Sequence, residues 1–157
     1  MGRILMRRLR QTKPFPTQAE ESLVNLLLAG AWLRDRLDRA LAPLGLTHVQ
    51  YNVLRILRGA PDGLPRREIA CRLIDRAPDV TRLVDRLARS GLVSRSPGRR
   101  DRRQAVARLT PRGGDLTARG DQAVDAVLRA VAQRAAREDL VTLSRVCESI
   151  YGSDEPE

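Results

Sequence analysis

The stretch that decides the fold reads PDVTRLVDRLARSG (78–91), LVSRS (92–96), PGRRDRR (97–103) and QAVARLT (104–110). Four aliphatic residues in its first part recur at the i, i+3, i+4, i+7 spacing of a helix that buries one side: Val80, Leu83, Val84 and Leu87. Gly91 predicts a left-handed helix end, and the short runs 92–96 and 104–109 predict two strands around the basic turn. A helix followed by a basic hairpin is one known way to hold double-stranded DNA.

A second short helix is expected just upstream, over residues 65–73, with Pro65 as its first residue. Its apolar side would face the core, and its arginines would face out. At about 100° per residue, Arg82 and Arg89 of the following helix point away from that core. Two helices joined by a tight turn, the second with an arginine-rich outer face, are typical of a helix-turn-helix.

Longer helices are expected on both sides of this stretch. Thr17 with Glu20 predicts an N-cap for a helix that ends near position 42, and Thr47 with Gln50 predicts a capping box. Thr110 and the proline after it predict the start of a long helix to about position 136, with a last helix from about 137. The expected division is therefore a basic flexible arm (1–16), a first helix (17–46), a DNA-binding domain (47–109), C-terminal helices (110–151) and a tail (152–157).

The outer helices also carry apolar residues that one chain is unlikely to cover by itself. Val24 and Leu28 lie on a different side of the first helix from its main leucine stripe, and a helix that is apolar on two sides needs two partners. A near-heptad series in the last helix predicts a helix-pair seam: Leu140, Leu143, Cys147 and Ile150. These patterns predict a homodimer.

The positive charge is concentrated in two places. The chain has 157 residues and a formal net charge of +10. Residues 1–16 carry five basic groups and no acid, and residues 66–103 carry twelve arginines against five acids, whereas 17–65 are neutral and 104–157 come to −2. A basic stripe of this kind favours a polyanionic partner. A helical protein whose basic surface docks an acidic protein is the alternative.

Other classes of protein find little support. Cys71 and Cys147 lie far apart within apolar helical patterns, as expected of a reduced cytoplasmic protein, although a thiol-oxidation-responsive regulator stays an alternative. No apolar run is long enough for a membrane span. We expect no metal site, no cofactor and no enzymatic activity, because no ligand set, nucleophile–base arrangement or phosphate-binding glycine loop is present. Translation could begin at Met1 or at Met6.

Four segments together resemble the MarR family of bacterial transcription regulators: LGLTHVQYNVLRIL (44–57), REIACRL (67–73), APDVTRLVDRLARSGLVSR (77–95) and DRRQAVARLTPRG (101–113). The resemblance implies a mainly α, α+β winged helix-turn-helix fold, with N- and C-terminal helices forming an intertwined dimer lobe. It also implies a repressor that binds palindromic operators and is released by a small ligand, such as a phenolic compound or an aromatic carboxylate. The wing motif of the family falls on Asp101 and Arg103. The resemblance implies that Asp101 helps to hold the wing and that Arg103 reaches the minor groove.

The site expectations follow from both lines of reasoning. The residues expected to contact DNA are Pro78, Asp79, Thr81, Arg82, Arg86, Arg89, Arg99, Arg100, Arg102 and Arg103. The competing interpretation for two of them is pairing within the helix, of Arg82 with Asp79 or Asp85 and of Arg89 with Asp85; Arg86 has no acid at helical spacing. The resemblance further implies a pocket between the two lobes, to which Trp32, His48, Tyr51 and Phe15 are the candidates. The peroxide-sensing cysteine of one subgroup of the family has no counterpart near the start of the first helix.

Overall fold

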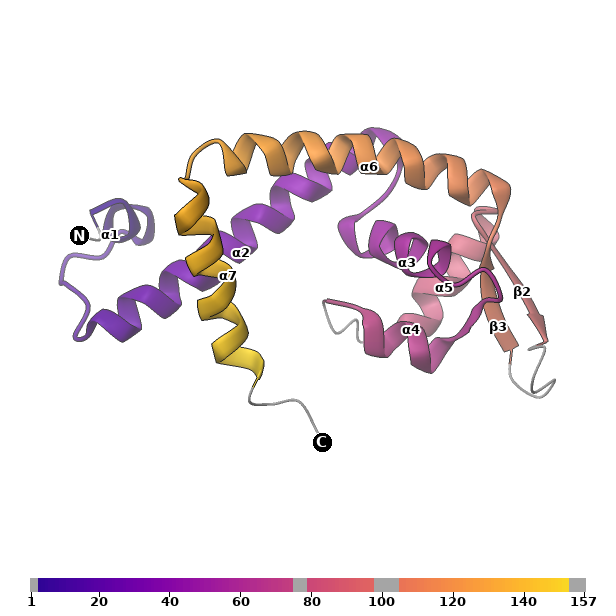
Figure 1. Ribbon diagram of the computed structural model, residues 1–157, viewed down its shortest axis with the longest axis horizontal. Helices are drawn as coiled ribbons and strands as arrows, with labels where there is room; N and C mark the ends of the chain where they lie inside the picture. The colour runs from indigo at the N-terminus through magenta and orange to yellow at the C-terminus, as the bar shows by residue number, and fades with distance from the viewer. Residues whose placement is uncertain (1–2, 75–78, 98–104, 153–157) are drawn as a thin grey trace.

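The structure, a computed structural model, describes residues 3–74, 79–97 and 105–152. The elements in chain order are α1 (Arg3–Leu9), α2 (Gln18–Leu41), the 3-10 turn η1 (Ala42–Leu44), α3 (His48–Arg58), β1 (Leu64–Pro65), α4 (Arg66–Arg72), α5 (Val80–Arg89), β2 (Val93–Pro97), β3 (Ala105–Leu109), α6 (Pro111–Ala132) and α7 (Arg137–Tyr151). Figure 1 shows two halves: α3, α4, α5 and the strands on one side, α1, α7 and most of α2 on the other. The long helix α6 runs along the top of both halves.

The helix starts are set by the polar residues that the sequence pointed to. Thr17 accepts a hydrogen bond from the Glu20 backbone N–H, and Thr47 forms a complete capping box with Gln50. Thr110 caps α6 in the same way, and Gly91 takes the left-handed conformation expected after α5, with φ +72°. The threonine caps confirm the predicted starts of α2, α3 and α6 within one residue.

The sheet has one strand more than the sequence predicts. Its order is β1-β3-β2, all antiparallel, with Val93 opposite Leu109 in the hairpin and Leu64 opposite Ala107 at the other edge. The strand β1 has only two residues, so it is too short to show an alternating pattern. Pro65, expected as the first helical residue, has extended backbone angles and precedes α4 as its N-cap.

The core lies where α3, α4 and α5 meet the sheet and α6. It is almost wholly aliphatic, and its largest fully buried members include Leu54, Leu57, Ile69, Val84 and Leu87. Val80 and Leu83 are partly buried against the same cluster, so all four predicted core positions of α5 are confirmed. Burial of this face fixes which side of α5 remains outside.

Two close contacts hold α6 against the half that contains α3, α4, α5 and the strands. A methyl group at Gly113 would lie 2.1 Å from the Leu92 carbonyl oxygen, and one at Gly120 would lie 2.8 Å from the ring of Tyr51. Since only glycine lets the backbones approach this closely, both positions are restricted to it. The long helix is thus anchored at its start and again at its middle.

The N-terminal segment differs from the expectation of a flexible arm. Residues 3–9 form the helix α1, and Leu5 within it is only 2% exposed. The sequence RILMRRL places apolar residues among arginines, so one side of a short helix can be buried while the charges stay in solvent. None of the helices described here is long and apolar enough to cross a membrane.

Candidate nucleic-acid interface and ligand cavity

The outer face of α5 presents the side chains predicted to contact DNA. Thr81, Arg82, Arg86 and Arg89 are all exposed, while Val84 and Leu87 on the opposite face are each 1% exposed. Pro78 and the predicted wing residues lie outside the described part of the chain: Arg99, Arg100, Asp101, Arg102 and Arg103. The described half of the expected interface therefore consists of α5 and the strands that lead to the turn.

Asp79 has a structural role at the start of α5. One of its carboxylate oxygens accepts a hydrogen bond from the Arg82 backbone N–H at 2.9 Å, and the other lies 2.9 Å from the Arg82 Nε. The carboxylate thus caps the helix and holds one guanidinium, as in the competing interpretation made from the sequence. The Arg82 side chain is still 87% exposed, so this contact does not remove it from the surface.

The second acid of α5 ties the helix to the sheet. Asp85 does not pair with Arg82 or Arg89; it accepts a 2.6 Å hydrogen bond from Nη1 of Arg95 on β2. Sequence reasoning missed this contact, because the two residues are ten positions apart on different elements. Arg86 and Arg89 make no ion pair with any residue that the structure describes. Their guanidinium groups are available to an anion.

A further arginine braces the base of the hairpin. Arg108 of β3 donates from Nε to the backbone carbonyl of Asp62 at 3.0 Å and from Nη1 to the hydroxyl of Ser96. These bonds connect the loop before β1 with β3 and β2. The strands that lead to the wing are therefore fixed relative to the core.

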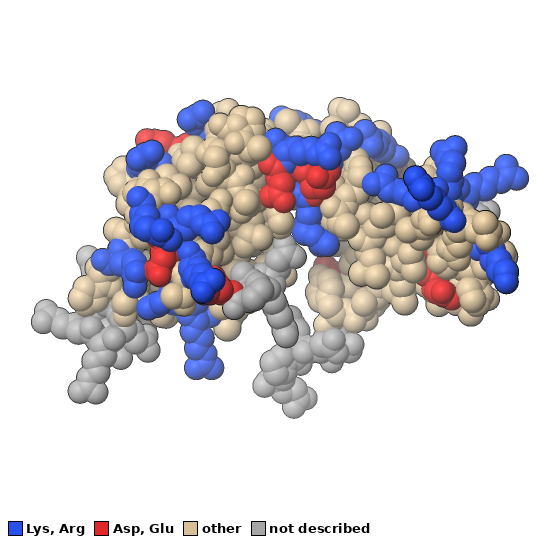
Figure 2. Space-filling model, turned by 180° about the vertical axis from the view of Figure 1, so that it is seen from behind, with Lys and Arg blue, Asp and Glu red and all other residues tan. Residues whose placement is uncertain are grey.

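Basic side chains outnumber acidic ones on the surface seen in Figure 2. Arginine and lysine lie over the half that carries the strands, at left in this view, and also across the middle of the molecule and at the opposite end. The basic side chains over the strand half agree with the basic stretch 66–103 and with a polyanion at the helix-turn-helix.

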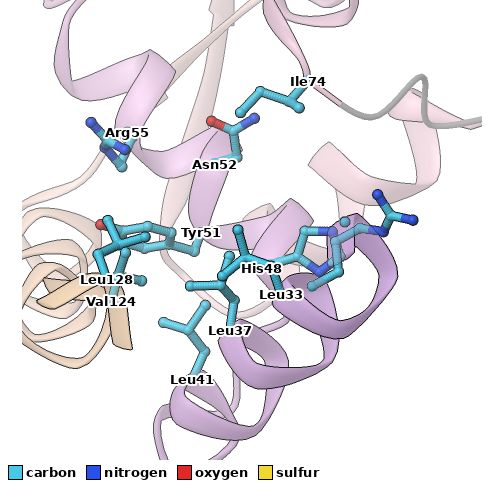
Figure 3. A pocket seen from close by; sticks show the side chains of 12 residues that line it. Leu33, Leu37, Leu41, His48, Tyr51, Asn52, Arg55, Ile74, Val124 and Leu128 are labelled. Carbon is cyan, nitrogen blue, oxygen red and sulfur yellow. The ribbon is translucent and has the colours of Figure 1, made fainter. Parts of the chain in front are cut away.

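A cavity lies between the two halves, where α2, α3 and α6 meet. Its volume is about 300 Å³. Its lining comes from all three helices and from one residue two positions after the end of α4: Gly30, Leu33, Arg34, Leu37, Leu41, His48, Tyr51, Asn52, Arg55, Ile74, Val124 and Leu128. Figure 3 shows the leucines of α2 on one side and His48, Tyr51, Asn52 and Arg55 of α3 facing them.

Two of the predicted pocket residues line this cavity, and Trp32 does not. Its indole lies at another hollow between α2 and α6, with the guanidinium carbons of Arg36 and Arg134 at 5.1 and 5.7 Å from the ring centroid. Trp32 is on a different side of α2 from Leu37, which does line the cavity. Phe15 is not among the cavity's lining residues either.

The polar groups of the cavity are cationic or neutral. Arg34 and Arg55 contribute guanidinium groups, and no acidic side chain is among the lining residues described. His48 sits at the edge, with its Nδ1 2.9 Å from a carboxylate oxygen of Asp38 and its backbone N–H donating to the same oxygen at 2.7 Å. Burial alone would raise the pKa of Asp38, but the hydrogen bonds from His48 outweigh it and lower that pKa.

Tyr51 links the cavity to a charged pair outside it. Its ring lines the cavity, while its hydroxyl donates to a carboxylate oxygen of Asp121 on α6 at 2.6 Å. The other carboxylate oxygen accepts a 2.5 Å bond from Nη1 of Arg58. Burial, with help from the Asp121 carboxylate, raises the pKa of Tyr51 to about 12. The hydrogen bond from Arg58 lowers the pKa of Asp121 despite the opposing effect of burial.

The outer helices leave apolar side chains in solvent. Leu23 and Leu27 of α2 are 50% and 72% exposed, whereas Val24 and Leu28, the predicted dimer contacts, are half-buried. On α7 no described residue is buried. Of its predicted seam, Leu143 and Ile150 are exposed, and Leu140 and Cys147 are half-buried. The uncovered side of α2 is therefore displaced from the side that the sequence favoured.

Cys71 is exposed and Cys147 half-buried, and both are free thiols. Within residues 3–74, 79–97 and 105–152, no group of three or more His, Cys, Asp or Glu side chains could hold a metal ion.

Comparisons with known proteins agree on one family. A family model described as MarR family matches residues 46–105. The chain is 31% identical over 138 residues to the HTH-type transcriptional repressor Rv2887 of Mycobacterium tuberculosis, covering 87% of this chain and 98% of that protein. Among solved structures, Sco3205 of Streptomyces coelicolor, a MarR family transcriptional regulator in complex with DNA, is 32% identical with a TM-score of 0.77 over 92% of this chain and 94% of that one. CouR of Rhodococcus jostii RHA1, bound to p-coumaroyl-CoA, is 25% identical with a TM-score of 0.73 over 87% and 95%.

Proposed function

Because the chain belongs to the MarR family and is a DNA-binding transcriptional repressor, not an enzyme, we propose that it acts as a homodimer on a palindromic operator and is released by a small anionic ligand. Each protomer would place α5 in the major groove of one half-site, with the segment 98–104 reaching the adjacent backbone or minor groove. The two half-site centres would lie about 34–36 Å apart, one turn of the duplex. A bacterial transcription regulator binds chromosomal DNA, which lies in the cytoplasm, so we infer a cytoplasmic location.

The observation that carries the operator proposal is the outer face of α5. Arg86 and Arg89 are exposed and make no ion pair with a described residue, while Arg82 is held near the helix start by an exposed contact to Asp79. A guanidinium is suited to bidentate contact with guanine, and one such pair contributes about 1–3 kcal/mol of discrimination. The similarity to Sco3205, whose structure contains DNA, supports DNA as the partner.

The dimer proposal rests on the uncovered apolar side chains of the outer helices. Leu27 on α2 and Val141 on α7 are 72% and 63% exposed, and Leu23, Leu143 and Ile150 are about half exposed. Apolar side chains gathered in this way are costly to leave in water and mark an interaction site. A second copy of the chain would cover the same helices on both partners in a two-fold arrangement.

The ligand proposal rests on the cavity between the halves. At about 300 Å³ it is at the small end of ligand sites, with mostly apolar walls and two arginines. An apolar wall with guanidinium groups suits a small molecule that joins a ring or chain to a carboxylate, such as an aromatic carboxylate. CouR was solved with p-coumaroyl-CoA, an acyl thioester far larger than this cavity, so ligand size is where the two proteins would differ.

Selection of bound fragments from random duplex DNA tests the operator proposal. The full chain should enrich an inverted repeat and bind it much more tightly than a shuffled duplex of the same composition. The protein should have twice the mass of one chain by light scattering, and the double variant Leu23→Asp, Leu27→Asp should shift it toward the monomer and weaken operator binding. Equal affinity for the selected and the shuffled duplex would refute the proposal.

The ligand arm of the test uses benzoate against its neutral analogue benzyl alcohol. Benzoate should release the operator at lower concentration than benzyl alcohol, and Arg55→Gln should reduce that difference. Arg39→Gln, on α2 but not in the cavity lining, serves as the matched control for loss of one guanidinium. If the two compounds acted equally in the wild type, the anionic preference would be wrong.

A further inference from the structure

One polar cluster joins the DNA-binding half to the rest of the molecule. Asp121, in the middle of α6, receives the hydroxyl of Tyr51 at 2.6 Å and Nη1 of Arg58 at 2.5 Å, with Nη2 of the same guanidinium at 3.4 Å. Both donors come from α3, one turn and three turns into it. A single carboxylate therefore binds two side chains that lie on the same face of α3, seven positions apart. Neither donor lies on an element expected to contact DNA.

The cluster sits where the two halves meet. α3 packs against α5 in the core, and α6 continues past the cluster into the half formed by α2 and α7 (Figure 1). The ring of Tyr51 is 6% exposed and lies against Gly120, the residue before Asp121, with no room for a methyl group between them. A close contact between the Gly120 backbone and the Tyr51 ring, next to a charge-assisted hydrogen bond, permits little rotation of α3 about α6.

We propose that Asp121 is a positioning residue for DNA binding, which sets the angle between the winged-helix half and α6 and thereby the half-site separation that the dimer accepts. This inference rests on the proposed function, because a separation is defined only for a dimer on a two-part operator. The carboxylate itself touches no DNA. It acts through Tyr51 and Arg58, which fix the orientation of α3, and α3 packs against α5 in the core.

The same cluster links occupancy of the cavity to operator binding. The ring of Tyr51 lines the cavity, and its hydroxyl is the atom that reaches Asp121. A ligand that displaces the ring draws the hydroxyl away from the carboxylate and leaves Arg58 as its only partner in the cluster. Occupancy of the cavity and the angle of the winged-helix half are then linked through one hydrogen bond.

The test compares Asp121→Asn with Asp125→Asn in the full chain. Asp125 lies one turn further along α6, is exposed, and makes no ion pair with a described residue, so it controls for the loss of one negative charge from a DNA-binding protein. Dissociation constants are measured for the selected operator and for operators with the half-sites moved by one base pair in either direction. Thermal unfolding and the salt dependence of binding are measured in parallel.

The wild type should strongly prefer the selected spacing. Asp121→Asn should bind that operator at least about fivefold more weakly, the lower end of typical coupling between sites, and should discriminate less between spacings. Its salt dependence should stay unchanged, because the phosphate contacts are the same. Asp125→Asn should keep the wild-type preference. Tyr51→Phe, which retains the ring against Gly120 and removes only the hydroxyl, should shift the spacing preference in the same direction.

The outcomes separate this inference from the proposed function. Identical spacing preferences in Asp121→Asn and Asp125→Asn would overturn the positioning role, and so would a lower melting temperature with unchanged preference, since that is a purely structural effect. If Asp121→Asn fails to fold, Tyr51→Phe decides by the same criterion. A wild type that prefers no operator over a shuffled duplex would refute the proposed function instead.

Discussion

Replacing Arg86 by alanine tests the proposed reading face of α5 most directly. Its side chain is exposed and makes no ion pair with a described residue, so nothing within the described chain competes with DNA for it. If Arg86 forms one bidentate contact with a guanine, the variant loses about 1–3 kcal/mol. Since about 1.4 kcal/mol corresponds to a factor of ten, the selected operator should bind about 5- to 150-fold more weakly.

Arg82→Ala is the matched comparison, because Arg82 occupies the same face with a partner already in place. Its 2.9 Å contact with Asp79 is between two well-exposed side chains, and such pairs contribute about 0.2–1 kcal/mol. Arg82 must give up that contact when it binds DNA, which offsets part of the free energy it gains there. The loss of operator affinity in Arg82→Ala should therefore be smaller than that in Arg86→Ala, by up to about fivefold. The cap of α5 survives in this variant, since Asp79 binds the backbone N–H of position 82.

The assay is fluorescence anisotropy with the selected operator and a shuffled duplex at several salt concentrations. A base contact lowers affinity for the operator and leaves the shuffled duplex nearly unchanged, whereas a phosphate contact lowers both and reduces the salt slope by about one. Equal losses on both duplexes would show that Arg86 positions the protein and does not read sequence. No loss on either would place DNA on another face.

Three further outcomes are expected. Burial and Asp121 raise the pKa of Tyr51 to about 12 in the folded protein, whereas its unfolded value is about 10. The folded state therefore favours the protonated phenol, and the free energy of unfolding measured in urea should fall by about 2–3 kcal/mol between pH 10 and 12. Tyr51→Phe should flatten this fall. Gly113→Ala forces a methyl group against the carbonyl of Leu92 and should destabilise the fold by about 2 kcal/mol or more in the same urea assay. Arg95→Met should change the free energy of unfolding by less than about 1 kcal/mol, because the pair of Arg95 with Asp85 is partly exposed. The same variant should weaken operator binding measurably, because α5 is no longer tied to the hairpin. Unchanged operator affinity would contradict a role of Arg95 in holding α5.

The sequence was sufficient where structure depends on neighbours along the chain. Capping residues such as Thr17, Thr47 and Thr110 act on N–H groups three residues away, and the core face of α5 follows from helical spacing alone. Local rules therefore located every long helix and the hairpin. The family resemblance then supplied the winged-helix arrangement, which spacing by itself did not contain.

Contacts between distant residues were beyond these rules. The strand β1 is defined by the pairing of Leu64 with Ala107. Asp85 pairs with Arg95 and not with an arginine of its own helix, because β2 lies beside α5. Trp32 lies at another hollow than the cavity between the halves, and a list of aromatic residues says nothing about the side of α2 on which each one lies. The carboxylate of Asp121, seventy positions from Tyr51, gave no signal in the sequence at all.

The glycines that let α6 approach its neighbours also make it a poor helix in isolation. Its first ten residues include Gly113, Gly114 and Gly120, and each costs an unsupported helix about 1 kcal/mol relative to alanine. This part of the helix therefore forms only when β2, β3 and α3 are in place to dock it. The winged-helix segment should accordingly not fold as an excised fragment ending at position 109, and a chimera that transplants this DNA-binding half to another dimerisation module would have to carry α6 with it.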